Sequence, residues 1–307
     1  MKTMGNVLRL PLRRKRVYYP YHRSAILQFV LPFLVLYVVF RLWPVVYAIA
    51  LSFHEWQGLG DWNFVGFRNY VRFFTDTYAV STVVNTLIMG GGELLITIPF
   101  GFALAYLLAD RKLPARGLFR TLYFIPRVVA LPVGAIVFTL MLHHDVGVVN
   151  YILSFFGIGN IPWLRTPGFA RLSVIMVRSW IGLGFVMIYF TAGLEGIPED
   201  LYESADIDGA NGLQKLFYIT IPMIRRVFVF VGIIGTVGAF QLFPVPFMMT
   251  QGGPSRATTP IMMYMLTRGI GHNQYGFASA MAVLLVLFLG ILALVQFRIG
   301  GRERTIG

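Results

Sequence analysis

Cysteine is absent from the 307-residue chain, and acidic residues are scarce. Without cysteine, neither a disulfide framework nor a thiolate metal site can form. Asp and Glu together number 13, and charged residues make up 13% of the chain. That share is about half of the roughly 25% typical of soluble domains. Because hydrophobic residues reach 57%, the composition indicates a membrane protein.

Lysine is also rare, with four residues in the chain. A phosphate-binding loop of an ATPase requires Gly-Lys followed by Ser or Thr, because glycine amides and the lysine together hold the phosphates. None of the four lysines follows a glycine, so the chain does not hydrolyse ATP by that route. Any energy that the chain uses must therefore come from another subunit or from an ion gradient.

Six apolar segments are long enough to cross a bilayer, which takes about 20 residues. They are Ala25–Phe53, Thr82–Leu108, Leu118–Leu142, Leu172–Gly193, Phe217–Phe243 and Phe277–Phe297. The first is too long for a signal-peptide core and is interpreted as a retained helix. The sequence therefore predicts an all-α, multi-pass membrane protein with six transmembrane helices in contact with lipid.

Arg and Lys in the connecting segments predict the orientation of these helices. With the N-terminus in the cytoplasm, the inside segments hold 17 Arg and Lys residues and the outside loops hold six. Positive loops stay on the cytoplasmic side, so we expect both termini inside. The formal charge of +13 is then explained by topology, and no nucleic-acid partner is expected.

Acidic residues concentrate in one short segment between the fourth and fifth apolar runs. Six of the 13 fall within 14 positions: Glu195, Glu199, Asp200, Glu203, Asp206 and Asp208. Acidic residues contribute little to orientation, so topology does not explain them. Pro198 suits a first helical position and Gly209 suits a helix end, which together predict a helix over about 198–208. A solvated loop is the plainer alternative.

This segment carries a family pattern. Glu203-Ser204-Ala205 is followed by Asp208-Gly209-Ala210 and, with nine residues between Gly209 and Ile219, by Ile219-x-Ile221-Pro222. The pattern resembles the EAA loop of ABC-importer permeases, with Ser204 and Ile221 as mild departures. In that family the loop forms a coupling helix that docks on the ATPase. The resemblance assigns ATPase coupling to the following residues: Glu203, Ser204, Ala205, Asp208, Gly209, Ala210, Ile219 and Pro222.

Further stretches resemble the sugar-uptake branch of the same family. They are "NTL" (85–87), "LFRTLYFIP" (118–126), "GVVNYILSFFGIGNIPWL" (147–164), "TQGGPSRATTP" (250–260) and "YGFASAMAV" (275–283). The resemblance implies a type I ABC importer permease fold in a bacterial or archaeal cytoplasmic membrane. It also implies a second permease subunit, an extracytoplasmic binding protein that delivers a sugar, and an ATPase dimer that carries the ATP and Mg. No cofactor is expected in this chain.

The apolar segments and their flanking charges, together with the family pattern, predict a division of the chain. Residues 1–24 would be a basic cytoplasmic N-terminus, and 25–297 the permease domain. The coupling loop would lie at 196–222 and a cytoplasmic tail at 298–307.

Four charged residues stand out at membrane depth in the apolar runs, where ionisable groups mark functional candidates. They are Arg41, Glu93, Arg127 and Arg178. Arg127 could extend to the inner membrane surface, and the role of Arg41 stays open. A Glu93–Arg178 ion pair is one interpretation of the other two. The second interpretation gives Arg178 to the substrate, favouring an acidic sugar or phosphate ester.

Arg178 begins a stripe on the fourth span. Arg178, Gly182, Phe185 and Tyr189 recur at helical spacing, which could make a sugar-binding wall or ordinary helix packing. The resemblance places the sugar pocket between the spans that flank the coupling loop. The predicted substrate path comprises Arg178, Gly182, Phe185, Tyr189, Gly235, Ala239, Gln241, Phe243 and Glu93.

Rival functions are an importer of glycerol phosphates or their diesters, an ion-coupled carrier and a membrane-embedded enzyme. A carrier is expected to show inverted repeats, and none is evident. An enzyme would need an intramembrane acid–base pair, and no span contains histidine. His143-His144-Asp145 at a span end is a weak metal candidate, because adjacent histidines rarely face one ion.

Overall fold

The protein is described here by a computed structural model that places residues 23–110 and 113–300. The predicted N-terminal segment (1–24) and C-terminal tail (298–307) therefore lie mostly outside the described residues. Contacts between residues divide the chain after Tyr47 into two units, which are taken separately.

The first unit is helical throughout its described part. It contains α1 (Arg23–Tyr37), the π-helical turn η1 (Val38–Leu42) and the start of α2 (Trp43–Ser52). Pro44 has no N–H, and its ring collides with the carbonyl four residues earlier in a regular α-helix. That carbonyl belongs to Phe40, inside the wider π turn, so the turn lets the helix continue past the proline.

The second unit contains the end of α2, a short antiparallel hairpin and then a series of helices. The hairpin pairs β1 (His54–Glu55) with β2 (Asn63–Phe64). The helices are α3 (Arg68–Thr75), α4 (Thr77–Leu107), α5 (Arg116–Val128), α6 (Leu131–Met141), α7 (Val148–Ser154), α8 (Pro167–Glu195), α9 (Glu199–Ile207), α10 (Gly212–Lys215), η2 (Leu216–Thr220), α11 (Ile221–Met223), α12 (Arg225–Phe240), α13 (Pro244–Thr250), α14 (Ile261–Leu266), η3 (Thr267–Gly271) and α15 (Tyr275–Gly300).

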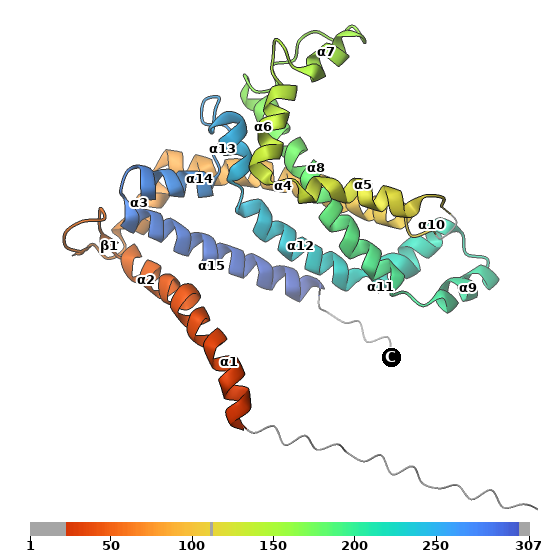
Figure 1. Ribbon diagram of the computed structural model, residues 1–307, viewed down its shortest axis with the longest axis horizontal. Coiled ribbons are helices and arrows are strands. Elements are labelled where there is room, and N and C mark those ends of the chain that lie inside the picture. Colours follow the sequence, from red (N-terminus) through yellow and green to blue (C-terminus); the bar gives the residue numbers. More distant parts are fainter. Residues whose placement is uncertain (1–22, 111–112, 301–307) are drawn as a thin grey trace, which may run out of the picture. The chain divides into compact units, whose positions relative to one another are not determined.

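The core of this unit forms where α4 packs along α8, with α5 and α12 against the same pair (Figure 1). Small residues let these helices approach closely. A Cβ on Gly184 of α8 would lie 2.4 Å from the Tyr123 carbonyl oxygen of α5. A Cβ on Gly90 of α4 would lie 2.9 Å from the Ala239 Cβ of α12. Close packing of small residues is how helices associate where lipid supplies no hydrophobic drive.

Two predicted spans are not straight helices. The third, Leu118–Leu142, consists of α5 and α6 bent by 97°, and the fifth, Phe217–Phe243, is bent by 65° between residues 212–223 and α12. The fifth bends at Ile224, two residues after Pro222. Pro222 removes a helical hydrogen bond, and the carbonyl four residues before it again lies in a π turn, η2. A bend inside a span cannot be predicted from its apolar composition alone.

Among the described residues, four helices are long and apolar enough to cross a membrane, and up to six spans result if each bent pair counts as one. The chain is thus a helical multi-pass membrane protein. The helix ends differ from the predicted ones by several residues: α4 begins at Thr77 rather than Thr82, and α8 runs from Pro167 to Glu195 rather than from Leu172 to Gly193.

Candidate functional site

The acidic segment folds as a short helix, α9, rather than a loop. Pro198 is its N-cap and Glu199 its first residue, so the helix begins one position after the predicted start at Pro198. Glu199 and Asp200 occupy the first turn, where carboxylates favour the positive end of the helix dipole. Gly209 has φ +75°, in the left-handed region that favours glycine, and the Ala210 N–H donates to the Ala205 carbonyl at 2.9 Å.

Short-range contacts hold this helix to the segment that follows it. Asn211 and Gln214 form a reciprocal capping box at the start of α10. Lys215 makes an ion pair with Asp206. The hydroxyls of Tyr202 and Thr220 lie 2.9 Å apart and connect α9 to η2.

Five of the eight predicted coupling residues lie around one cavity. Its volume is about 340 Å³, and its lining includes the predicted residues Ala205, Asp208, Gly209, Ala210 and Ile219. The other three predicted residues, Glu203, Ser204 and Pro222, are exposed and do not line the cavity. Their role in coupling stays a prediction.

Sequence reasoning missed the apolar surface of the same segment. Ile207, Leu213 and Tyr218 are 88%, 68% and 80% exposed. Large apolar side chains that are open to water beside a cavity mark an interaction surface. The available signal was Ile207, an apolar residue between two aspartates.

The two charged residues of α4 and α8 form an ion pair within the spans. Arg178 Nε donates to Glu93 Oε2 at 2.9 Å, and both side chains are nearly buried. Glu93 Oε1 also lies close to Gly182, because a Cβ on this glycine would be 3.6 Å from the oxygen. The pair anticipated as one interpretation of the sequence is therefore present, and contact with a substrate stays a prediction.

The rest of the predicted stripe continues toward the α9 end of α8. The rings of Phe185 and Tyr189 meet edge to face with centroids 4.7 Å apart. Tyr189 also contacts Phe230 of α12, with centroids 5.0 Å apart. Arg127 at the end of α5 lies over the Phe185 ring, 4.9 Å from its centroid. The stripe thus lies beside a third charge, one that sequence reasoning left without a role.

The predicted path residues of the fifth span are spread over different environments. Ala239 is buried against Gly90, and Gly235 faces Leu94 of α4. Gln241 is exposed at the end of α12, and Phe243 stacks on Phe247 of α13. Gly235 and Ala239 therefore lie in the contact with α4, whereas Gln241 and Phe243 do not share it.

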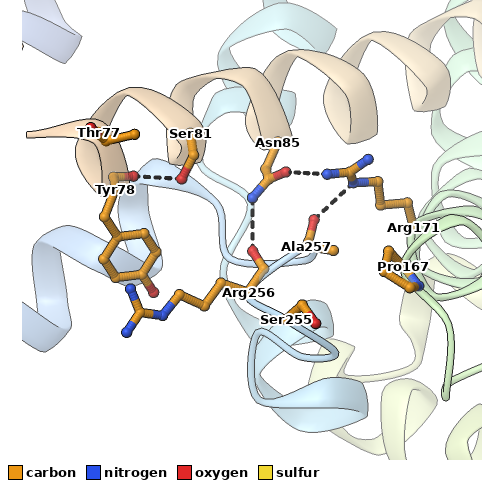
Figure 2. Close-up of a pocket in the computed structure, with 9 residues that line it drawn as sticks. All are labelled: Thr77, Tyr78, Ser81, Asn85, Pro167, Arg171, Ser255, Arg256 and Ala257. Carbon is orange, nitrogen blue, oxygen red and sulfur yellow. Dashed lines mark hydrogen bonds between the residues drawn. The ribbon is translucent and has the colours of Figure 1, made fainter.

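A polar network links α4 and α8 to the loop between α13 and α14 (Figure 2). The Asn85 amide donates to the carbonyls of Arg256 and Thr259 at 2.9 and 3.1 Å. Arg171 donates to Asn85 Oδ1 at 2.8 Å and to the Ala257 carbonyl at 2.9 Å. Two spans therefore fix the backbone of the "TQGGPSRATTP" loop.

The network borders a cavity of about 540 Å³. Figure 2 shows Tyr78 and Arg256 on one side of it, with the guanidinium 4.2 Å from the ring centroid. Arg171 and Pro167 lie on the other side. The motifs "NTL" (85–87) and "TQGGPSRATTP" (250–260) lie at this site, but no functional residue was predicted here.

The histidine pair forms no metal centre in the part of the chain that the structure describes, where no group of three potential ligands occurs. Asp145 instead pairs with Arg165 at 2.6 Å.

Comparison with known proteins identifies the family of this chain. Residues 97–302 match the family described as binding-protein-dependent transport system inner membrane component. The chain belongs to this family.

Several relatives match this chain over most of their own length, and their names include a sugar or a sugar derivative. The arabinooligosaccharides transport system permease protein AraP of Halalkalibacterium halodurans is 33% identical, over 97% of this chain and 96% of the relative. The lactose transport system permease protein LacF of Rhizobium radiobacter is 33% identical over 90% and 93%. The sulfoquinovosyl glycerol transport system permease protein SmoG of Agrobacterium fabrum is 33% identical over 88% and 86%.

The fold is shared with solved transporters. A chain of a bacterial alginate ABC transporter, crystallised in complex with an alginate pentasaccharide-bound periplasmic protein, matches with a TM-score of 0.80, 23% identity, and coverage of 90% of this chain and 93% of that one. The predicted ABC-importer permease family is confirmed. The same membership argues against an ion-coupled carrier and against an enzyme.

Proposed function

We propose that the chain is one of two permease subunits of an ATP-driven importer for a sugar or oligosaccharide. Family membership carries this proposal, because the family is defined by transport that depends on a binding protein. Relatives named for arabinooligosaccharides, lactose and trehalose/maltose support the substrate class. An extracytoplasmic binding protein would deliver the sugar, and an ATPase dimer would hold the ATP and Mg.

In this proposal the permease domain has six spans, with each bent helix pair counted as one, and both termini face the cytoplasm. The bacterial or archaeal inner membrane is its location. The positive residues of the inside segments support this orientation. It places α9 on the cytoplasmic side, where the exposed Ile207, Leu213 and Tyr218 are available to the ATPase.

The coupling mechanism follows from the local geometry. Gly209 closes α9, and the Tyr202–Thr220 and Lys215–Asp206 contacts make α9, α10 and η2 one body. The segment runs on through α11 into α12, which packs on α4. Movement of the docked helix would therefore pass to α12 and reach the Gly90–Ala239 contact. The predicted path residues of α8 and α12 would carry the sugar between these spans.

Reconstitution tests this function. The complex of this chain, its partner permease and the ATPase is placed in liposomes with ATP inside and the binding protein outside. The probes are radiolabelled arabinotriose, lactose and trigalacturonate. We expect uptake of a saccharide that requires both ATP and the binding protein. Uptake that persists without ATP, or no uptake of any saccharide that the binding protein retains, would overturn the proposal.

A second candidate is an importer of acidic saccharides. The observation that favours it is the positive charge of Arg127 beside the paired Glu93 and Arg178.

A further inference from the structure

Three charged side chains, Glu93 of α4, Arg178 of α8 and Arg127 of α5, lie near one another, and their charges do not cancel. Glu93 and Arg178 neutralise each other at 2.9 Å. Arg127 interacts electrostatically with Glu93 but lies outside ion-pair distance of every carboxylate in residues 23–110 and 113–300. One positive charge remains, and it belongs to Arg127.

The guanidinium of Arg127 is far from the cytoplasmic end of the spans. It lies over Phe185, which precedes the last residue of α8, Glu195, by ten positions. At about 1.5 Å per residue, this is roughly 15 Å along the helix. Arg120, seven residues earlier on α5, pairs with Glu195 at 3.0 Å and lies near that end of α8. Arg127 therefore lies deeper, toward the middle of the spans.

Arg127 is also exposed, unlike the pair beside it. A cation exposed to lipid at this depth is costly, whereas one that faces a water-filled path is tolerated and marks such a path. The break between α5 and α6 follows Arg127 directly, and broken helices at membrane depth occur where they border a cavity or protein. The half-buried rings of Phe185 and Tyr189 continue the same surface.

We propose that Arg127 forms an anion-binding subsite in the translocation path, which takes the carboxylate or sulfonate of an acidic saccharide. Phe185 and Tyr189 supply aromatic faces for the sugar ring beside it. The Glu93–Arg178 pair keeps Arg178 neutralised, so specificity for charge rests on Arg127 rather than on Arg178. This inference rests on the proposed transport function.

The absence of cysteine makes the subsite directly testable. Tyr189→Cys introduces a single thiol beside Phe185. The complex is assembled with cysteine-free partner subunits in nanodiscs, where both faces are open to reagents. The measurement is the ratio of modification rates by an anionic reagent, methanethiosulfonate ethylsulfonate, and by its cationic trimethylammonium counterpart.

We expect the anionic reagent to be favoured, and Arg127→Gln to lower the ratio by about tenfold, as removal of one nearby charge in a partly desolvated site implies. Arg127→Lys keeps the charge and should keep the ratio. Arg120→Gln is the matched control on the same helix, since Arg120 is already paired with Glu195. It should change the ratio by less than about twofold. Galacturonate, but not galactose, should slow modification, and only while Arg127 is present.

A ratio unchanged by Arg127→Gln would overturn the subsite. The subsite would also be overturned if neither reagent modified the thiol, or if galactose protected it as well as galacturonate does. A preference for the cationic reagent would overturn it too, because it would reveal a carboxylate of a partner subunit at Arg127. ATP-dependent uptake of saccharide is measured on the same purified complexes in liposomes, because nanodiscs enclose no lumen. If the complex that keeps Tyr189 shows no ATP-dependent uptake, the transport function is refuted. If the complex transports but Arg127→Gln leaves the ratio of modification rates unchanged, only the subsite is refuted.

Discussion

The acidic segment and the mid-span charges differ in how far along the chain their contacts reach. In the segment, Asn211 meets Gln214, Lys215 meets Asp206 nine residues away, and Tyr202 meets Thr220 eighteen residues away. The mid-span pair joins Glu93 to Arg178 across 85 residues. The segment therefore keeps its shape by itself and can move as a unit, whereas the pair exists only after α4 and α8 have packed.

The largest effect should come from damage to the local unit. Gly209→Trp places a side chain at φ +75°, a conformation that costs a non-glycine residue about 1–2 kcal/mol. It also puts a large ring at the cavity beside Ala205. We expect ATP-coupled uptake to be abolished while membrane insertion, measured by extraction and protease mapping, is unchanged. Glu203→Lys should do the same by reversing an exposed charge.

Gly212→Ala is the control for this segment, because a Cβ there meets no atom within 4 Å and α10 tolerates alanine. It should transport normally. Normal uptake in the Gly209 and Glu203 variants would mean that the segment does not couple.

The next effect should come from breaking the long-range pair. Arg178→Gln leaves a nearly buried carboxylate unpaired, which costs about 3–5 kcal/mol. Thermal unfolding of the purified complex should show a large drop, and Glu93→Gln should behave alike. The double variant should recover most of the loss, since neither charge is then stranded. If the double variant loses as much thermal stability as the two single variants together, the two residues act independently.

A smaller effect is expected where α4 meets α12. Gly90→Ala would place its Cβ 2.9 Å from the Ala239 Cβ and 3.1 Å from its carbonyl oxygen. Such overpacking costs about 1–3 kcal/mol and separates the helices. Gly91→Ala, one residue along, meets no atom within 4 Å and should gain up to about 1 kcal/mol of helix propensity. Equal melting temperatures for the two variants would contradict the close contact.

The smallest effect concerns the start of α4. Burial alone would raise the pKa of Asp76, but hydrogen bonds from Tyr264, Ala79 and Tyr78, together with Arg268, outweigh it and hold the pKa below its ordinary value of 3.8. The stabilisation is therefore present above about pH 4 and is lost as the pH falls through the lowered pKa.

Asp76→Asn keeps a capping side chain and removes the charge, so the loss should be below about 1 kcal/mol. Melting curves of wild type and variant should differ above pH 5 and converge below pH 4. A gap that widens in acid would contradict this assignment.

The separation of contacting residues along the chain also decides which features could be predicted from the sequence. The helix start near Pro198, the stop at Gly209 and the family pattern at 203–222 are local, and the structure places them together with only a one-residue shift at Pro198. The bend of 97° between α5 and α6 follows Arg127, and a count of apolar residues cannot register it. The Asn85–Arg171 network joins residues 86 apart, and each of its members looks like an ordinary polar residue in the sequence.

Site-specific photo-crosslinking tests docking of α9 on the ATPase most directly. A benzoylphenylalanine replaces Ile207, which is 88% exposed on α9, or Leu59, which is 91% exposed between β1 and β2. The assembled complex is irradiated with the binding protein present. We predict that position 207 crosslinks to the ATPase subunit and that position 59 does not. Crosslinking of position 207 to the binding protein, or of position 59 to the ATPase, would contradict both the orientation and the coupling role.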